Sequence, residues 1–141
     1  MNDNGRILAI DYGKKRTGLA ISDKLGIIAN PLSPISTSSP KLLIDEIASI
    51  IEERNVKTIV CGIPYLPNGE EGEQVVEVRS FLSALQTKVK RKINFAEIDE
   101  RHTTKEAENM WRQVGFNKAK AKNQLDSTAA VIILREFLET R

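Results

Sequence analysis

The order of apolar segments predicts an α/β protein built on a mixed five-stranded sheet, three strands antiparallel and then two parallel, with helices on both faces. Residues 6–35 contain three strand-like runs joined by short connections, which indicates an antiparallel meander. Strand-like and helix-like runs then alternate from residue 40 to residue 98, which indicates crossovers between parallel strands. The 141 residues (1–141) and 15.8 kDa fit one domain with a full hydrophobic core.

The meander is expected to have strands at residues 7–10, 17–21 and 27–35. The first run, Ile7–Ile10, is apolar throughout, as in a central strand that is covered on both faces. Tyr12–Lys15 has the composition of a tight turn with a basic tip. Pro31 and Pro34 limit ladder hydrogen bonding in the third strand, which places that strand at the edge of the sheet.

The parallel part of the sheet is expected to contain strands at 57–63 and 93–98, and helices are expected at 40–54 and 73–90. Ser39 can cap the first of these helices, and Pro40 suits its first turn. Apolar residues recur at helical spacing in both helices. The strand at 57–63 is apolar along nearly its whole length, which is typical of a buried parallel strand.

The C-terminal part is expected to hold two helices separated by a basic segment. Thr103–Glu106 resembles a capping box and opens a helix that continues to about Val114. Residues 115–123 are basic and poor in apolar side chains, which predicts partial disorder there. Asp126–Leu138 is expected to form the closing helix. This order of elements is that of a ribonuclease-H-like fold.

Composition argues against a membrane protein and a secreted protein. The chain is 40% hydrophobic and 28% charged, and no apolar run approaches the roughly 20 residues that span a bilayer. The N-terminus lacks the basic start and apolar segment of a secretory signal. The one cysteine, Cys61, lies in an apolar strand and is expected to fill the core. We therefore expect a cytoplasmic protein.

Charge is distributed unevenly along the chain. Residues 41–87 hold four basic and eight acidic side chains, whereas residues 88–122 hold ten basic and five acidic ones. The basic part contains two clusters, formed by Lys88, Lys90, Arg91 and Lys92 and by Lys118, Lys120 and Lys122. Such clusters suit a polyanion such as nucleic acid, although a solvated surface has the same composition.

Three carboxylates fall where they can converge. Asp11 ends the first strand, Glu100 follows the last strand, and Asp126 opens the closing helix. The carboxyl ends of adjacent parallel strands lie side by side, and carboxylate oxygens suit Mg²⁺ or Mn²⁺, which support phosphodiester hydrolysis. Asp99 competes with Glu100, because neighbours on a strand face opposite sides. A turn-forming Asp11, a surface ion pair of Glu100 and a helix-dipole role for Asp126 are the structural alternatives.

Several basic side chains adjoin these acids and are candidates for contact with phosphate groups. His102 directly follows Glu100 and could assist a proton transfer, although a surface position is the simpler interpretation. The candidates for nucleic-acid binding are Lys14, Lys15, Arg16, Arg101, His102, Lys118, Lys120 and Lys122.

Six short motifs, in order, resemble the YqgF/RuvX family over residues 6–139. The motifs are Ile10–Gly13, Gly18–Ala20, Gly62–Pro64, Asn68-Gly69 with Gly72, Asp99–Arg101 with Thr103–Ala107, and Asp126–Leu134. The resemblance implies a ribonuclease-H-like domain related to the RuvC Holliday-junction resolvases. It also implies a bacterial cytoplasmic nuclease that matures the 5′ end of precursor 16S ribosomal RNA, with Asp11, Glu100 and Asp126 as its acids.

The chain departs from the resolvase pattern at two places. Resolvase relatives carry an acid at the end of the fourth strand, where this chain has Gly62-Ile63-Pro64. They also carry two acids three residues apart on the last helix, where Asp126 is followed at that spacing by Ala129. The resemblance thus implies that Glu100 substitutes from the next strand. His102 stands where the family pattern has an apolar residue.

Three functions stay open at this point. The leading one is a metal-dependent ribonuclease acting on precursor RNA, with the small ribosomal subunit as a partner. The second is a resolvase-like endonuclease for branched DNA, favoured if the chain is a homodimer rather than a monomer. The third is a non-catalytic RNA-binding assembly factor. An actin-like ATPase is set aside, because those enzymes enclose the nucleotide between two such domains.

Overall fold

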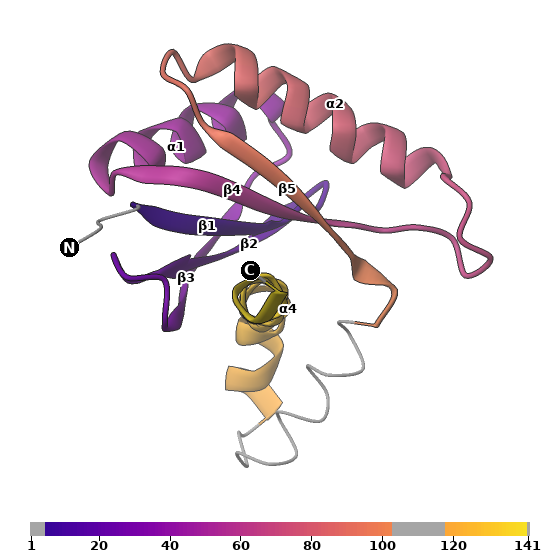
Figure 1. Cartoon of the computed structure of the whole chain (residues 1–141). Coiled ribbons are helices and arrows are strands. Elements are labelled where there is room, and N and C mark those ends of the chain that lie inside the picture. The colour runs from indigo at the N-terminus through magenta and orange to yellow at the C-terminus, as the bar shows by residue number, and fades with distance from the viewer. Residues whose placement is uncertain (1–4, 103–117, 141) are drawn as a thin grey trace.

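The computed structural model describes the backbone of residues 5–102 and 118–140, and the side chains of residues 5–101 and 128–140 (Figure 1). Its elements are β1 (Arg6–Asp11), β2 (Arg16–Ser22), β3 (Ala29–Ser36), α1 (Pro40–Glu53), β4 (Val56–Ile63), α2 (Glu73–Lys88), β5 (Asn94–Asp99), the 3-10 turn η1 (Glu100–His102) and α4 (Lys118–Thr140). The expected helix at 103–114 lies outside the described residues.

The strands form one five-stranded sheet in the order β3-β2-β1-β4-β5. β2 pairs antiparallel with both β1 and β3, whereas β4 pairs parallel with both β1 and β5. The predicted mixed sheet is therefore confirmed, with the proline-containing β3 at one edge. Because β1, β4 and β5 run in one direction, their carboxyl ends share one side of the sheet.

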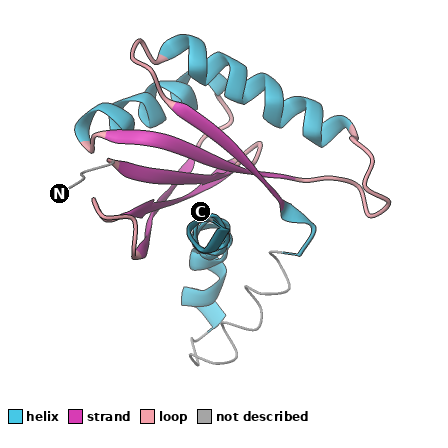
Figure 2. Ribbon diagram, in the orientation of Figure 1, coloured by secondary structure: helices cyan, strands magenta, loops and turns pink. Residues whose placement is uncertain are grey.

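Helices cover both faces of the sheet, with α1 and α2 on one side and α4 on the other (Figure 2). The strand β1 is apolar from Ile7 to Ile10 because its side chains pack against helices on both faces of the sheet. Its residues Ile7 and Ala9 pack in a cluster with Ile133 of α4. The alternate residues Leu8 and Ile10 pack in a larger cluster with α1 and α2. Strand alternation thus decides which side chains can meet α4.

Helix boundaries follow the sequence signals at α1 and depart from them at α4. The Ser39 hydroxyl accepts a hydrogen bond from the Leu42 backbone N–H at 3.2 Å, so the predicted cap is confirmed. The disorder predicted for residues 115–123 is wrong from Lys118 onward, because α4 begins there. The segment 118–125 is rich in alanine and lysine, which favour helix without requiring an apolar face. None of the helices in the described ranges is long and apolar enough to span a bilayer.

Arg91 closes the turn between α1 and β4, at the side of the sheet opposite the carboxyl ends of the parallel strands. Its Nη2 donates to the carbonyl oxygens of Ile51 at 2.8 Å and Val56 at 2.9 Å. Its Nε lies 3.2 Å from the Glu52 carboxylate, and its Nη1 donates to the side-chain oxygen of Asn55, which has a φ of 53°. One guanidinium therefore satisfies two backbone carbonyls of a strained turn.

We expect Arg91→Ala to lower the free energy of unfolding by about 2–3 kcal/mol, because it removes charge-assisted bonds to two carbonyls. Arg91→Lys should recover only part of this loss, since an ammonium cannot reproduce the fork. Urea unfolding followed by circular dichroism measures both values. The matched control is Lys92→Ala, which removes the same charge from an exposed neighbour. A change in Arg91→Ala no larger than in this control would contradict the assignment.

Candidate active site

Asp11 ends β1 on the face that α4 covers. It follows Ile7 and Ala9 in the strand alternation, and it lies opposite Gly18 of β2 in the antiparallel register. The turn that follows is tight, because a Cβ on Gly13 would lie 2.2 Å from the Arg16 carbonyl oxygen. The hydroxyl of Thr17 donates to the Gly13 carbonyl oxygen at 3.3 Å and closes this turn. The turn fixes the direction in which the chain leaves Asp11.

Glu100 reaches the same place from the other side of β4. It opens η1 directly after β5, and its side chain lies over Gly62 near the end of β4. A Cβ built on Gly62 would stand 3.0 Å from Cδ of Glu100 and 2.7 Å from Cδ1 of Ile133 in α4. The space that a side chain at position 62 would occupy is thus filled by Glu100 and α4.

Cys61 lies in β4, between the two strands whose ends carry Asp11 and Glu100. Its thiol is fully buried, and Cys61 pairs with Ile10, the residue before Asp11. Burial raises the pKa of this thiol, and the carboxylates of Glu100 and then Asp11 raise that pKa further. The thiol therefore stays neutral, and its expected role in the core is confirmed. Both carboxylates lie close enough to Cys61 to influence it electrostatically.

Asp126, the third predicted acid, lies within α4 rather than at its start. It precedes Ile133 by seven residues, which is about two helical turns. The side chain of Asp126 lies outside the described part of the structure, as do those of His102, Lys118, Lys120 and Lys122. The structure thus brings Asp11 and Glu100 to one edge and places the backbone of Asp126 on the helix that covers that face.

Asp99 lies on the other side of β5 from Glu100. It follows Glu97 in the alternation, and Glu97 forms an ion pair with Arg79 of α2 at 3.2 Å. Asp99 accepts hydrogen bonds from Nε of Arg101 at 2.9 Å and from the Arg101 backbone N–H at 3.0 Å. These contacts, through the side-chain hydrogen bond from Asp99 above all, raise the pKa of the Arg101 guanidinium. The two neighbouring acids therefore face different surroundings.

The basic candidates near the acids occupy the hairpin tip and η1. Lys14, Lys15 and Arg16 are exposed at the tip between β1 and β2, where Nζ of Lys14 lies 3.2 Å from the Glu77 carboxylate of α2. Arg101 lies against the loop between β4 and α2. These four cations flank the edge at which β1 and β5 end.

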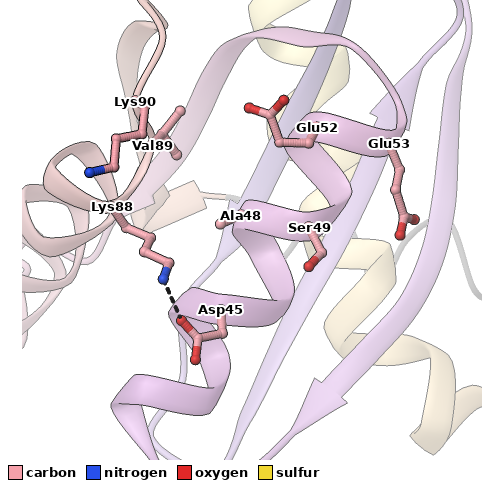
Figure 3. Close-up of a pocket in the computed structure, with 8 residues that line it drawn as sticks. All are labelled: Asp45, Ala48, Ser49, Glu52, Glu53, Lys88, Val89 and Lys90. Atoms are coloured by element: carbon pink, nitrogen blue, oxygen red, sulfur yellow. Dashed lines mark ion pairs between the residues drawn. The ribbon is translucent and has the colours of Figure 1, made fainter.

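The basic cluster at residues 88–92 lies at the opposite end of the parallel strands from the acids, just before β5 begins. Nζ of Lys88 lies 3.3 Å from the Asp45 carboxylate, and both Lys41 and Lys88 lower the pKa of Asp45. Lys88, Lys90 and Asp45 border a hollow of about 650 Å³ between α1 and the end of α2, with walls of mixed charge (Figure 3). Because Lys88 and Arg91 bind acids of α1, much of this cluster serves internal contacts.

The donor set at the edge fits a divalent cation of the magnesium type. Carboxylate oxygens from Asp11 and Glu100 are hard ligands, and the missing side chain at Gly62 leaves Glu100 its position. Among the side chains that the structure describes, no group of three or more His, Cys, Asp or Glu residues is placed to hold a metal ion. Further ligands to a cation held by Asp11 and Glu100 would come from outside this set of described side chains.

Sequence reasoning missed the part played by three residues. Gly62 was significant only as the absence of an acid, yet it makes room for the Glu100 side chain. Tyr65 and Arg79 form a network with the loop after β4, through a hydrogen bond of 3.3 Å from Nη2 of Arg79 to the tyrosine hydroxyl. The sequence carries no signal for either feature, because the approach of Glu100 to Gly62 depends on the pairing of β4 with β5 and the network joins three elements.

Solved structures with a similar fold include Holliday junction resolvases. The structure of Thermus thermophilus RuvC in complex with a Holliday junction substrate is 14% identical, with a TM-score of 0.60, and the alignment covers 98% of this chain and 96% of that chain. The fowlpox virus resolvase in complex with Holliday junction DNA is 10% identical, with a TM-score of 0.61 and coverage of 96% and 97%. At this identity the likeness shows the fold, and the predicted ribonuclease-H-like fold is confirmed.

Relatives with higher identity span nearly the whole chain. A Chloroflexus aggregans protein named "Putative pre-16S rRNA nuclease" is 39% identical over 135 residues, which are 96% of this chain and 94% of that protein. A Bacteroides fragilis protein of the same name is 35% identical over 138 residues, covering 96% and 97%. The family model described as "RuvX: Holliday junction resolvase" matches residues 5–140. The chain therefore belongs to the RuvX family, as its motifs led us to expect.

Proposed function

We propose that this chain is a metal-dependent nuclease that hydrolyses phosphodiester bonds near the 5′ end of precursor 16S ribosomal RNA. The observation that carries the proposal is that Asp11 and Glu100 stand at the ends of the strands on either side of β4, on the face that α4 covers, where Gly62 leaves room for the Glu100 side chain. Membership of the RuvX family supports nuclease chemistry at this edge. The names of the full-length relatives favour RNA as the substrate.

In this proposal Asp11, Glu100 and Asp126 hold Mg²⁺ or Mn²⁺ between the sheet and α4. Bound there, the metal supplies Lewis-acid stabilisation of phosphate oxygens and lowers the pKa of a bound water. The chain itself contributes the Asp11 carboxylate, which a tight turn follows, and the Glu100 carboxylate, which opens η1, so that little reorganisation is needed when substrate binds. Cys61 is buried in the cluster with α1 and α2, on the face of the sheet opposite Gly62 and Glu100, so its thiol does not compete as a ligand.

The cations at the rim bind the RNA backbone. Lys14, Lys15 and Arg16 on the hairpin tip and Arg101 on η1 flank the acids and attract phosphates by charge. His102 and the lysines of the first turns of α4 (Lys118, Lys120 and Lys122) extend this surface in the proposal. The protein works in the cytoplasm, as a monomer or a homodimer, on precursor RNA associated with the small ribosomal subunit.

A junction-resolving activity on DNA is the second candidate. The description of the matching family model as a Holliday junction resolvase favours it. It calls for a two-fold dimer with two sites acting on symmetric strands. A non-catalytic RNA-binding assembly factor is the third candidate, because Gly62 replaces one acid of the resolvase pattern.

Cleavage assays on two substrates separate the candidates. The purified protein is incubated with a 5′-extended 16S precursor RNA and with a four-way DNA junction, in Mg²⁺, in Mn²⁺ and in EDTA. We expect cutting of the precursor in either metal and none in EDTA, because the carboxylates need a cation to act on phosphate. Cleavage of the junction alone would contradict the ribonuclease function and support the resolvase function. RNA binding without cutting of either substrate would favour the assembly factor.

A further inference from the structure

We propose that Asp99 is a positioning residue that fixes Glu100 on one side of β5 and Arg101 on the other. The inference rests on the proposed function, since it assigns a role toward the metal carboxylates. It also separates two adjacent acids that the sequence alone leaves as competitors.

The Asp99 carboxylate caps the turn that begins with Glu100. Its Oδ1 accepts the Arg101 backbone N–H at 3.0 Å, two residues further along the chain. Such a bond fixes the backbone across the residue between its two ends, which here is Glu100. The direction in which the Glu100 side chain leaves η1, toward Gly62 and Ile133, therefore depends on this cap.

The same carboxylate also binds the guanidinium of Arg101 through two of its nitrogens. Nε of Arg101 lies 3.1 Å and 2.9 Å from the two Asp99 oxygens, and Nη2 lies 2.5 Å from Oδ2. Both oxygens of Asp99 are thus engaged with a guanidinium on the α2 side of the sheet. A carboxylate held in this way on the opposite face from Glu100 is poorly placed to be a metal ligand.

Arg101 in turn holds the loop between β4 and α2. Its guanidinium carbon lies 6.0 Å from the centre of the Tyr65 ring, and its Nη1 donates to the Pro67 carbonyl oxygen at 3.5 Å. Arg79 fixes the same tyrosine at its hydroxyl and bonds to Glu71 at 2.6 Å. Two arginines therefore hold the loop that follows Ile63 at the end of β4, and Asp99 orients one of them.

Binding of Mn²⁺ alone, counted by electron paramagnetic resonance of the free ion, tests this role without catalysis. We expect Asp99→Ala to weaken Mn²⁺ binding about 10- to 100-fold, the range for residues that orient a ligand. Asp99→Asn should stay within about threefold of the wild type, because its amide oxygen can still accept the Arg101 N–H. Glu97→Ala, which removes an ion pair two residues earlier on the same face, should bind as the wild type does. Circular dichroism and urea unfolding show that each variant is folded.

Two outcomes would overturn the inference. Asp99→Ala binding Mn²⁺ as the wild type does would show that Glu100 needs no such support. Asp99→Asn binding as weakly as Glu100→Gln would make Asp99 a ligand itself. Steady-state cleavage gives a further readout, since lost positioning of Glu100 lowers kcat more than it raises KM. A wild type that neither binds Mn²⁺ nor cuts RNA would instead refute the proposed nuclease, and the positioning role with it.

Discussion

Asp11→Asn is expected to reduce cleavage of precursor RNA by at least about 100-fold, beyond the range for residues that only orient a ligand. The change keeps the size of the side chain and removes the charge that a divalent cation requires. Single-turnover cleavage at saturating Mn²⁺ measures the chemical step separately from substrate binding. Glu100→Gln should lose a similar factor, because the two carboxylates approach the same edge beside Gly62.

The control for Asp11→Asn is the same substitution at Asp45. That carboxylate pairs with Lys41 and Lys88 beside the hollow between α1 and α2, away from the acids. Asp45→Asn should leave cleavage unchanged, and both variants should unfold in urea with the slope of the wild type. Full cleavage by a folded Asp11→Asn protein would show that Asp11 is not part of the active site. The proposed nuclease function would then lose its main support.

Gly62→Ala is expected to cost about 1 kcal/mol of unfolding free energy and to lower cleavage by about 10- to 100-fold. The added Cβ would stand 2.7 Å from Cδ1 of Ile133 and 3.0 Å from Cδ of Glu100. Both neighbours are ends of side chains and can move. Movement of Ile133 costs only packing, whereas movement of Glu100 displaces the carboxylate from its place over Gly62.

A double variant separates these two effects. Ile133→Val removes Cδ1, the atom that the new Cβ would meet, and alone it costs about 0.5–1.5 kcal/mol. Gly62→Ala with Ile133→Val should therefore be more stable than the sum of the single changes predicts. Cleavage by the double variant should stay low, because Glu100 is still displaced. Recovery of activity together with stability would show that position 62 acts through packing against α4 alone.

The fold could be predicted from the sequence because its elements signal themselves locally. Several features of the fold can each be recognised within one short stretch of sequence. They are the apolar run of β1, the two prolines of β3 and the cap at Ser39. The start of α4 could not be predicted from apolar periodicity, because alanine and lysine form helix there without an apolar face. Helix propensity was the better guide for that segment.

The acids could be placed at strand ends from the sequence, but their relation to other strands could not. That Glu100 lies over Gly62 depends on the parallel register of β4 and β5, in which Ile63 pairs with Asp99. The opposite sides taken by Asp99 and Glu100 follow from alternation once that register is known. The contacts of Arg79 and Arg101 with Tyr65 join three elements, so no single segment of the sequence could have predicted them.

The empty side-chain position at Gly62 has a consequence for comparing sequences within this fold. A carboxylate at the end of β4 and a glutamate arriving from η1 would claim the same volume, since even a Cβ at position 62 comes within 3.0 Å of Glu100. A chain can therefore hold one acid or the other there, but not both in this arrangement. An alignment that scores each column separately would count two differences, an acid missing at the end of β4 and a glutamate added at position 100. In the molecule, one carboxylate has replaced the other.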